Sequence, residues 1–287
     1  MRGHPPILRR GDTGDEVAHL QRLVGAEVDG DFGPATEQLV MMRQMALGLE
    51  PDGVVGPLTW RALLDGVEPL PNGWIDRTEL HASQFGPHRP YSKITGITLH
   101  QTATCFLRLG APPTKRARAI ERVGALRAHF VGLRDGTVVQ ATPLDRVAYH
   151  AQAVFNRSDV GIEIDGYYAG VEGDDSTFWR PSSKPNRQPM AVSQVQIDAM
   201  RDLCAWVCAE VKARGGEVRY VHAHRQTHWG KPSDPGELLW REVGVWCQDA
   251  LGLSDGGDGW RVTSGTGKAP GRAIPRAWDP RRTADYR

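Results

Sequence analysis

The sequence has no excess of charge of either sign, because 35 Lys and Arg residues stand against 34 Asp and Glu residues. A near-neutral chain has no electrostatic reason to bind a nucleic acid, so we expect no such partner. No segment is apolar over the roughly 20 residues that a membrane-spanning helix needs, and the first ten residues lack the apolar run of a signal peptide. We therefore expect a protein without a transmembrane segment that is made in the cytoplasm.

Cysteine is scarce, and no two of the four cysteines form a Cys-x-x-Cys pair. Cys204 and Cys208 share one face of a predicted helix with apolar residues such as Leu203 and Val207. Buried thiols are therefore favoured over a disulfide or a metal site for all four: Cys105, Cys204, Cys208 and Cys247.

The length favours two domains, because 287 residues exceed what one compact domain usually needs. We place one domain at residues 1–66, a linker rich in Pro and Gly at 67–92, a larger domain at 93–253 and a basic tail rich in Gly and Pro at 254–287. The tail has little apolar periodicity, which predicts a solvated or draped segment. A monomer is the default expectation.

An internal repeat marks the first domain. Asp29-Gly30-Asp31-Phe32-Gly33-Pro34-Ala35-Thr36 is echoed 23 residues later by Asp52-Gly53-Val54-Val55-Gly56-Pro57-Leu58-Thr59. Asp-Gly favours a tight turn with a positive φ, and Gly-Pro-x-Thr starts a helix. The pattern predicts three helices, at 14–24, 34–46 and 57–65.

These motifs, preceded by the segment Leu8 to Gln21, resemble the three-helix peptidoglycan-binding domain found on many wall hydrolases. The run Met41-Met42-Arg43-Gln44 departs from the Ala-Val-x-x-Phe-Gln pattern that is usual in that family, so the core there is expected to differ. A helical spacer without a ligand remains the alternative.

The larger domain alternates strand and helix patterns, which is typical of a sheet covered by helices. Strands are expected at 94–100, 137–142, 160–165 and 217–222, and helices at 115–129, 193–214 and 236–251. A long loop between Tyr167 and Met190 carries the pair Phe178-Trp179, and it is as well explained by function as by a solvated insertion. The fold class is thus α/β, a mixed central sheet flanked by helices, preceded by the small three-helix domain.

Two segments carry residues suited to metal chemistry. His100 ends an apolar strand, and residues 221–236 run from a strand into a loop with three His, a Lys and an Asp. A catalytic Zn²⁺ site needs three nitrogen or oxygen ligands and an open position for water. His100, His224 and Asp234 would supply that set.

Four ordered motifs then resemble the type-2 N-acetylmuramoyl-L-alanine amidases, whose fold is shared with animal peptidoglycan recognition proteins. They span about 150 residues: Thr98-Leu99-His100, Val147-Ala148-Tyr149-His150-Ala151, Asn156 to Ile164, and His224-Arg225 with Lys231 to Gly236. The resemblance implies peptidoglycan as the partner and Zn²⁺ as the cofactor, held by His100, His224 and Asp234. It further implies Glu163 as the acid/base residue and Lys231 as a polarising cation.

Two positions depart from the family pattern. Lys231 stands three residues before Asp234 where some branches have two, and Tyr149 replaces a frequent Trp. His150 and Asn156 are candidate substrate-binding residues, although a structural imidazole explains His150 equally well. His129, His222 and His228 are expected to be structural or peripheral.

The resemblance therefore predicts zinc-dependent cleavage of the bond between N-acetylmuramic acid and L-alanine, as in an endolysin that reaches the wall after release or delivery. A noncatalytic peptidoglycan receptor on the same fold and a zinc endopeptidase of the wall are the alternatives. Receptors of this kind often lack the third metal ligand, which Asp234 supplies here.

Overall fold

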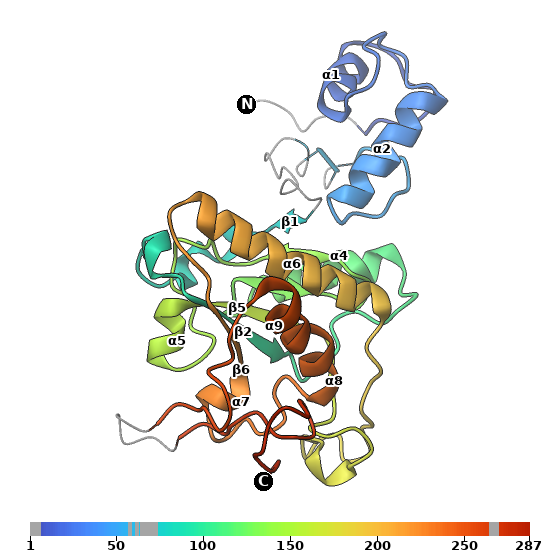
Figure 1. The fold of residues 1–287 in the computed structure, drawn as a ribbon. Helices are drawn as coiled ribbons and strands as arrows, with labels where there is room; N and C mark the ends of the chain where they lie inside the picture. Colours follow the sequence, from blue (N-terminus) through green and yellow to red (C-terminus); the bar gives the residue numbers. More distant parts are fainter. Residues whose placement is uncertain (1–6, 57–58, 61–62, 64–73, 264–269) are drawn as a thin grey trace. The chain divides into compact units, whose positions relative to one another are not determined.

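The computed structural model describes residues 7–56, 59–60, 63, 74–263 and 270–287 (Figure 1). The chain divides into two compact units, one of residues 1–77 and 110–122 and the other of residues 78–109 and 123–287. Among the described residues, no helix is long and apolar enough to cross a membrane.

The first unit contains α1 (Asp15–Val24) and α2 (Pro34–Ala46), drawn in blue in Figure 1. It also contains β1 (Ile75–Asp76) and all but the last residue of α4 (Pro113–Val123). The repeat predicted α1 and α2 to within one residue. The third predicted helix, 57–65, falls partly outside the described residues, and its described positions 59, 60 and 63 are helical.

A small apolar core holds the first unit together. Met41 and Met42 point away from it and are 38% and 59% exposed. The departure from the family pattern at these two residues therefore does not reach the core. The buried members of this core come from α1, α2, the helical positions 60 and 63, and the loops around them: Leu8, Val17, Leu20, Phe32, Val40, Leu47, Val55, Trp60 and Leu63.

Each copy of the repeat is organised around one buried glutamine. The amide nitrogen of Gln21 donates to the side chain of Asp29, the carbonyl of Asp31 and the hydroxyl of Thr36, and its oxygen accepts from the amide of Gly30. Gln44 makes the same four bonds 23 residues later, to Asp52, Val54, Thr59 and Gly53. The repeat is therefore a shared hydrogen-bonding plan as well as a shared sequence.

The sheet of the second unit is mixed, as predicted. Its strands are β2 (Gly96–Gln101), β3 (Phe130–Gly132), β4 (Val138–Gln140), β5 (Asp159–Ile164) and β6 (Tyr220–Ala223), in the order β4-β3-β5-β2-β6. β2 runs parallel to both β5 and β6, β3 runs parallel to β5, and β3 and β4 pair antiparallel. The sequence pattern missed β3, because its three residues are too few to show a period.

Helices flank this sheet. The longest, α6 (Gln194–Ala213), crosses the strands in Figure 1, and Ser193 caps its first turn. The predicted helix 236–251 is observed as α8 (Glu237–Leu239), a π-helical stretch η4 (Trp240–Val245) and α9 (Trp246–Leu251). Two short helices were not predicted, α5 (Ala153–Ser158) and α7 (His224–Thr227). Short 3-10 turns lie at Thr78–Gln84, Tyr91–Lys93 and Asp175–Thr177.

The expectation of a solvated tail is wrong for the described part of residues 254–287. Trp278 is fully buried, and Ile274 and Asp279 are 2% and 1% exposed. The composition misled because the tail is held by a few aromatic side chains and many polar contacts, which produce no apolar periodicity.

All four cysteines are free, as predicted. Cys204 and Cys247 are buried, whereas Cys105 and Cys208 are only partly buried. The expectation of buried thiols thus holds for two of the four.

Replacing Gln44 tests the repeat. We expect Gln44→Ala to destabilise the first unit by about 2–3 kcal/mol, because it leaves a buried amide and carbonyl without partners. Hydrogen exchange of the Gly53 amide, which donates to Gln44, should accelerate together with that of the surrounding turn. The exposed substitution Met42→Ala serves as the control. Unchanged exchange at Gly53 in Gln44→Ala would contradict the assignment.

Candidate metal centre

The strand order of the second unit places three chemically distinctive residues at one edge of the sheet. His100 near the end of β2 lies in register with Glu163 on the adjacent β5. His224 begins α7 directly after β6, the neighbour of β2 on its other side. Because the three strands are parallel, their carboxyl ends meet at the same edge, which is the usual location of sites in such sheets.

Three side chains converge there in a geometry suited to one metal ion. The Nδ1 atoms of His100 and His224 are 2.9 Å apart, and an Asp234 carboxylate oxygen lies 3.0 Å from His224 Nδ1. One ligand atom from each residue lies within 4.8 Å of the others, and all three residues are buried. Two imidazole nitrogens and a carboxylate oxygen are ligands that Zn²⁺ accepts.

The electrostatics of His100 suit ligation. Burial and then the neighbouring imidazoles of His224 and His150 hold the pKa of His100 well below 6.5. A neutral imidazole is the form that binds metal, so no proton has to be removed from His100.

Gln101 orients Asp234, a role that the sequence did not reveal. Its backbone N–H donates to Asp234 Oδ1 at 2.9 Å, and its side-chain amide donates to the carbonyls of Ser233 and Tyr168. Its side-chain oxygen accepts from the Tyr168 amide at 2.7 Å. The only sequence signal for this role was the position of Gln101 next to His100 at the end of a strand.

His150 lies behind His100, on the side away from His224. Its Nδ1 is 3.0 Å from His100 Nε2, and its own Nε2 is 3.4 Å from the carbonyl of Asp159. With Nδ1 of His100 directed at the metal position, the remaining Nε2–H can donate to His150. Partners of this kind fix the tautomer and ring orientation of a metal ligand.

Asp159 is the centre of a set of polar contacts that lies behind the ligand candidates. Its carboxylate accepts from Thr98 Oγ1 at 2.7 Å and from Ser158 Oγ at 2.7 Å, and it lies 2.8 Å from His222 Nδ1. Burial alone would raise its pKa, but the contacts with His222, Thr98 and Ser158 outweigh burial and hold the pKa below 3.8. His222 is thus structural, as is the buried His129, which accepts from the Gly161 amide.

Glu163 has one carboxylate oxygen that is buried and has no hydrogen-bond partner among the described residues. Burial and then the charge of Asp234 raise the pKa of Glu163 well above 4.5, while Lys231 acts in the opposite sense. An orphaned acidic oxygen beside a cluster of ligands is the kind of group that an added water or substrate atom would satisfy.

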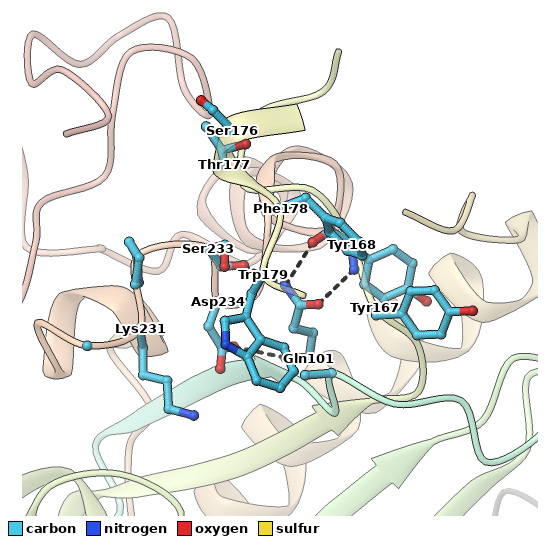
Figure 2. A pocket seen from close by; sticks show the side chains of 13 residues that line it. Gln101, Tyr167, Tyr168, Ser176, Thr177, Phe178, Trp179, Lys231, Ser233 and Asp234 are labelled. Atoms are coloured by element: carbon cyan, nitrogen blue, oxygen red, sulfur yellow. Dashed lines mark hydrogen bonds between the residues drawn. The ribbon is translucent and has the colours of Figure 1, made fainter. Parts of the chain in front are cut away.

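A pocket of 310 Å³ opens beside Asp234 (Figure 2). Lys231 and Asp234 line one side of it, and the Tyr167–Trp179 part of the long loop lines the other, where the Trp179 indole is 55% exposed. The long loop therefore forms a wall of this pocket, which favours a functional role for the loop over a solvated insertion. The Arg180 and Arg187 guanidinium groups lie over the Phe178 and Tyr167 rings.

A second hollow, of 480 Å³, contains Asn156. Its lining includes the exposed Tyr149 and also His228, whose ring is 6.3 Å from that of the ligand candidate His224. The Asn156 side chain accepts from the Ala151 amide at 2.7 Å. His150 lines neither hollow.

Two family models match the chain. Residues 90–237, more than half of the sequence, match the family described as N-acetylmuramoyl-L-alanine amidase. Residues 13–63 match a family described as a peptidoglycan binding domain. The first match contains every residue that converges on the candidate metal centre.

Individual relatives match over shorter stretches. The "Probable N-acetylmuramoyl-L-alanine amidase" of Bacillus licheniformis is 33% identical over 109 residues, which are 35% of this chain and 30% of that protein. The "Zinc D-Ala-D-Ala carboxypeptidase" of Streptomyces albus G is 41% identical over 64 residues, 20% of this chain and 25% of that protein. The chain spans about a quarter to half of the curated relatives it matches. A solved amidase from Clostridium intestinale is 14% identical over 58% of this chain and 91% of its own, with a TM-score of 0.40.

Asp159→Asn tests the layer behind the site. At pH 7 we expect a loss of about 3 kcal/mol in the free energy of unfolding, because a buried pair loses one charged partner. The folded pKa lies below 3.8, so the stabilisation is present above that value and is lost as the pH falls through the folded pKa. The difference between wild type and variant in urea unfolding should therefore narrow below about pH 4.

Asp249→Asn, which changes an exposed carboxylate, is the control for that experiment. A deficit in Asp159→Asn that is equally large at pH 7 and pH 3.5 would contradict the role given to the charge.

Proposed function

The chain belongs to the N-acetylmuramoyl-L-alanine amidase family, and from this membership we propose that it hydrolyses the amide bond between N-acetylmuramic acid and L-alanine in bacterial peptidoglycan with the help of Zn²⁺. The observation that carries the proposal is the convergence of His100, His224 and Asp234 on one point, with the unpartnered oxygen of Glu163 buried in the adjacent strand. A bound Zn²⁺ would supply a Lewis acid that polarises the scissile carbonyl and lowers the pKa of water toward about 7.

The chain's own residues then divide the remaining work. Glu163 accepts a proton from the attacking water and returns it to the L-alanine amine as that amine leaves, which a carboxylate with one buried oxygen and a raised pKa can do near neutral pH. Lys231, exposed on the wall of the pocket beside Asp234, places its ammonium where negative charge develops on the carbonyl oxygen. The Gln101 contacts keep Asp234 fixed during these steps.

The substrate would extend to both sides of the centre. The pocket between Trp179 and Lys231 lies on one side of the ligand cluster, and the hollow with Asn156 and His228 adjoins His224. We propose that these two spaces hold the groups on either side of the scissile bond. In this proposal Asn156 lines the space that would hold substrate, whereas His150 contributes by holding His100.

The first unit would bind the wall. Residues 13–63 match a peptidoglycan-binding family, and a binding module tethered to an enzyme raises the enzyme's local concentration at its substrate. The proposed place of action is the bacterial cell wall.

A noncatalytic receptor on the same fold is disfavoured, because the full set of three ligands and the acid/base carboxylate are all present. Mass spectrometry of digested peptidoglycan separates the possibilities. Intact stem peptides that begin with L-alanine mark an amidase, cleavage inside the peptide marks a peptidase, and binding without product marks a receptor.

Removing one ligand tests the metal. We expect Asp234→Ala to bind Zn²⁺ at least 100-fold more weakly and to release no stem peptides, and we expect a chelator to inactivate the wild type reversibly. Zinc content by elemental analysis and product release by mass spectrometry provide the readouts, and Asp202→Ala, at an exposed carboxylate on α6, is the control. Full activity in zinc-free Asp234→Ala protein would exclude the ligand assignment.

Replacing the acid/base group separates chemistry from metal binding. We expect Glu163→Gln to retain Zn²⁺ while its kcat falls by about 10²- to 10⁴-fold, since the amide cannot accept the water proton. Glu217→Gln, at an exposed carboxylate paired with Arg219, should leave both properties unchanged. Retained kcat in Glu163→Gln would assign the proton transfer to another group.

A further inference from the structure

The segment 270–287 is not accounted for by the proposed reaction, yet several of its side chains are buried in the second unit. Trp278 is fully buried, and the Trp278 indole donates to the carbonyl of Gly170. This contact lies at the base of the loop that forms the wall of the pocket.

Arg225 is the residue at which this segment contacts the loop of residues 224–236, which carries the ligand candidates His224 and Asp234 and is called the metal-binding loop below. It follows the ligand candidate His224 directly and is 1% exposed. Its guanidinium carbon lies 4.8 Å from the ring centres of both Trp278 and Tyr286. No carboxylate of the described residues pairs with it. Burying a cation without a paired carboxylate costs free energy, which the hydrogen bonds and ring contacts of this guanidinium have to offset.

Those contacts close the metal-binding loop on itself. The Arg225 guanidinium donates to the carbonyls of Pro232 at 2.6 Å and Tyr286 at 3.0 Å. Its backbone N–H donates to the Asp234 carbonyl at 2.9 Å, and its own carbonyl accepts from the Arg272 amide at 2.7 Å. Arg225 thus ties the beginning of the loop, at His224, to its end at Asp234, and ties both to residues 270–287.

The same segment also holds the opposite wall of the pocket. The Tyr286 hydroxyl lies 3.5 Å from the carbonyl of Thr177, and Arg287 donates to Ser176 Oγ at 2.7 Å. Thr177 and Ser176 both line the pocket. A Cβ on Gly170 would collide with the Tyr286 hydroxyl, so the close approach of these two segments requires glycine at position 170.

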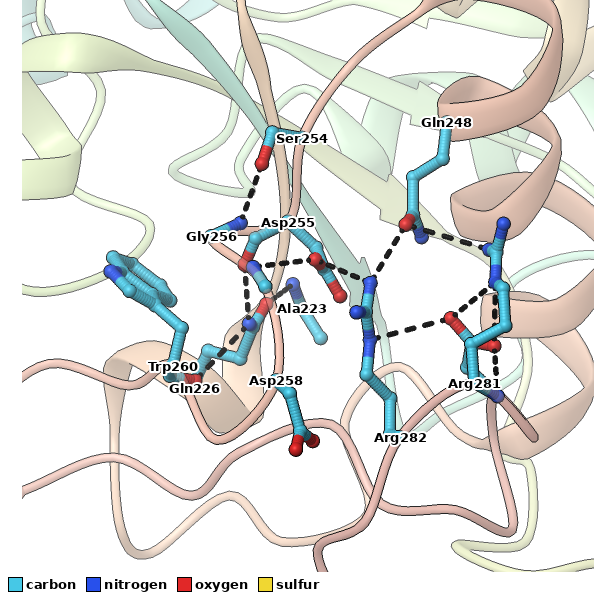
Figure 3. A network of polar contacts seen from close by, with 12 residues as sticks. Ala223, Gln226, Gln248, Ser254, Asp255, Gly256, Asp258, Trp260, Arg281 and Arg282 are labelled. Atoms are coloured by element: carbon cyan, nitrogen blue, oxygen red, sulfur yellow. Dashed lines mark hydrogen bonds and ion pairs between the residues drawn. The ribbon is translucent and has the colours of Figure 1, made fainter.

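Away from the pocket, ion pairs fasten the segment to the rest of the unit (Figure 3). Arg282 pairs with the buried Asp255 at 2.7 Å, as Figure 3 shows. Arg281 pairs with Asp249 on α9 at 2.7 Å. Gln226, in the metal-binding loop, donates to the carbonyl of Asp255 at 2.9 Å in the same network. The segment therefore connects α9, the metal-binding loop and the pocket wall.

We propose that residues 270–287 form a clasp that positions the metal centre, with Arg225 as the positioning residue that transmits its hold to His224 and Asp234. The clasp acts through hydrogen bonds to backbone carbonyls and through two aromatic rings. None of its described residues is among the three candidate metal ligands. The part of this inference that concerns Zn²⁺ affinity rests on the proposed function. The part that concerns the rigidity of the loop, measured by hydrogen exchange, rests on the loop geometry alone.

The test compares Arg225→Met with Arg282→Ala in the full chain. Arg225→Met removes the guanidinium donors to Pro232 and Tyr286 but keeps the backbone hydrogen bond to Asp234 and much of the side-chain volume. Arg282→Ala instead removes the ion pair with Asp255, which lies away from the pocket. We expect Arg225→Met to lower the Zn²⁺ affinity, measured by competition with a chelator, by about 10- to 100-fold. We expect Arg282→Ala to lower the melting temperature while its Zn²⁺ affinity stays within about twofold of the wild type, since its contacts lie outside the ligand shell.

Hydrogen exchange of residues 228–236 gives the second readout, which needs no metal. Exchange there should be faster in Arg225→Met than in Arg282→Ala. Should Arg225→Met fail to fold, Tyr286→Ala, which removes one ring and the contact with Thr177, is expected to show the same two effects more weakly. Equal Zn²⁺ affinity and equal loop exchange in Arg225→Met, Arg282→Ala and the wild type would overturn the clasp. Absence of Zn²⁺ binding in the wild type would instead overturn the proposed function, and the exchange data would still decide on the clasp.

Discussion

The parallel pairing of β2 with β5 on one side and β6 on the other is the constraint on which the site depends. It sets His100 opposite Glu163 and brings the chain out of β6 directly into His224. Residues more than 120 positions apart in sequence thereby reach hydrogen-bonding distance. Only Asp234 and Lys231 come from a loop, and Asp234 is held to the sheet through the backbone of Gln101. A rigid strand edge thus supplies most of the precision that a metal centre requires.

Much of the fold and of the candidate site could be predicted from the sequence, for identifiable reasons. The strand ending in His100 and the helix 194–213 carry strong periodicity, and the Asp-Gly turns of the repeat depend on local chemistry. The metal ligands were suggested by residue type and by resemblance, and the structure brings all three together. Features that depend on contacts between distant segments were not predictable. These include β3, which is too short to show a period, and Gln101, whose role exists only once Asp234 folds back over it.

The tail shows the same limit in a sharper form. Its sequence is basic and rich in Gly and Pro, which is the composition of a solvated segment. Its described part is nevertheless held in place by Trp278, which is fully buried, and by arginines that pair with carboxylates on other elements. Composition measures how much apolar surface a segment can bury on its own. It does not measure how well a few side chains fit into a scaffold that is already present.

The position of Arg287 has a practical consequence for engineering. Its side chain is bonded to Ser176, so any polypeptide that continues past this residue leaves the fold at the wall of the pocket. A bulky fusion partner joined there would crowd this pocket and would restrict the access of a large ligand more than that of a small one.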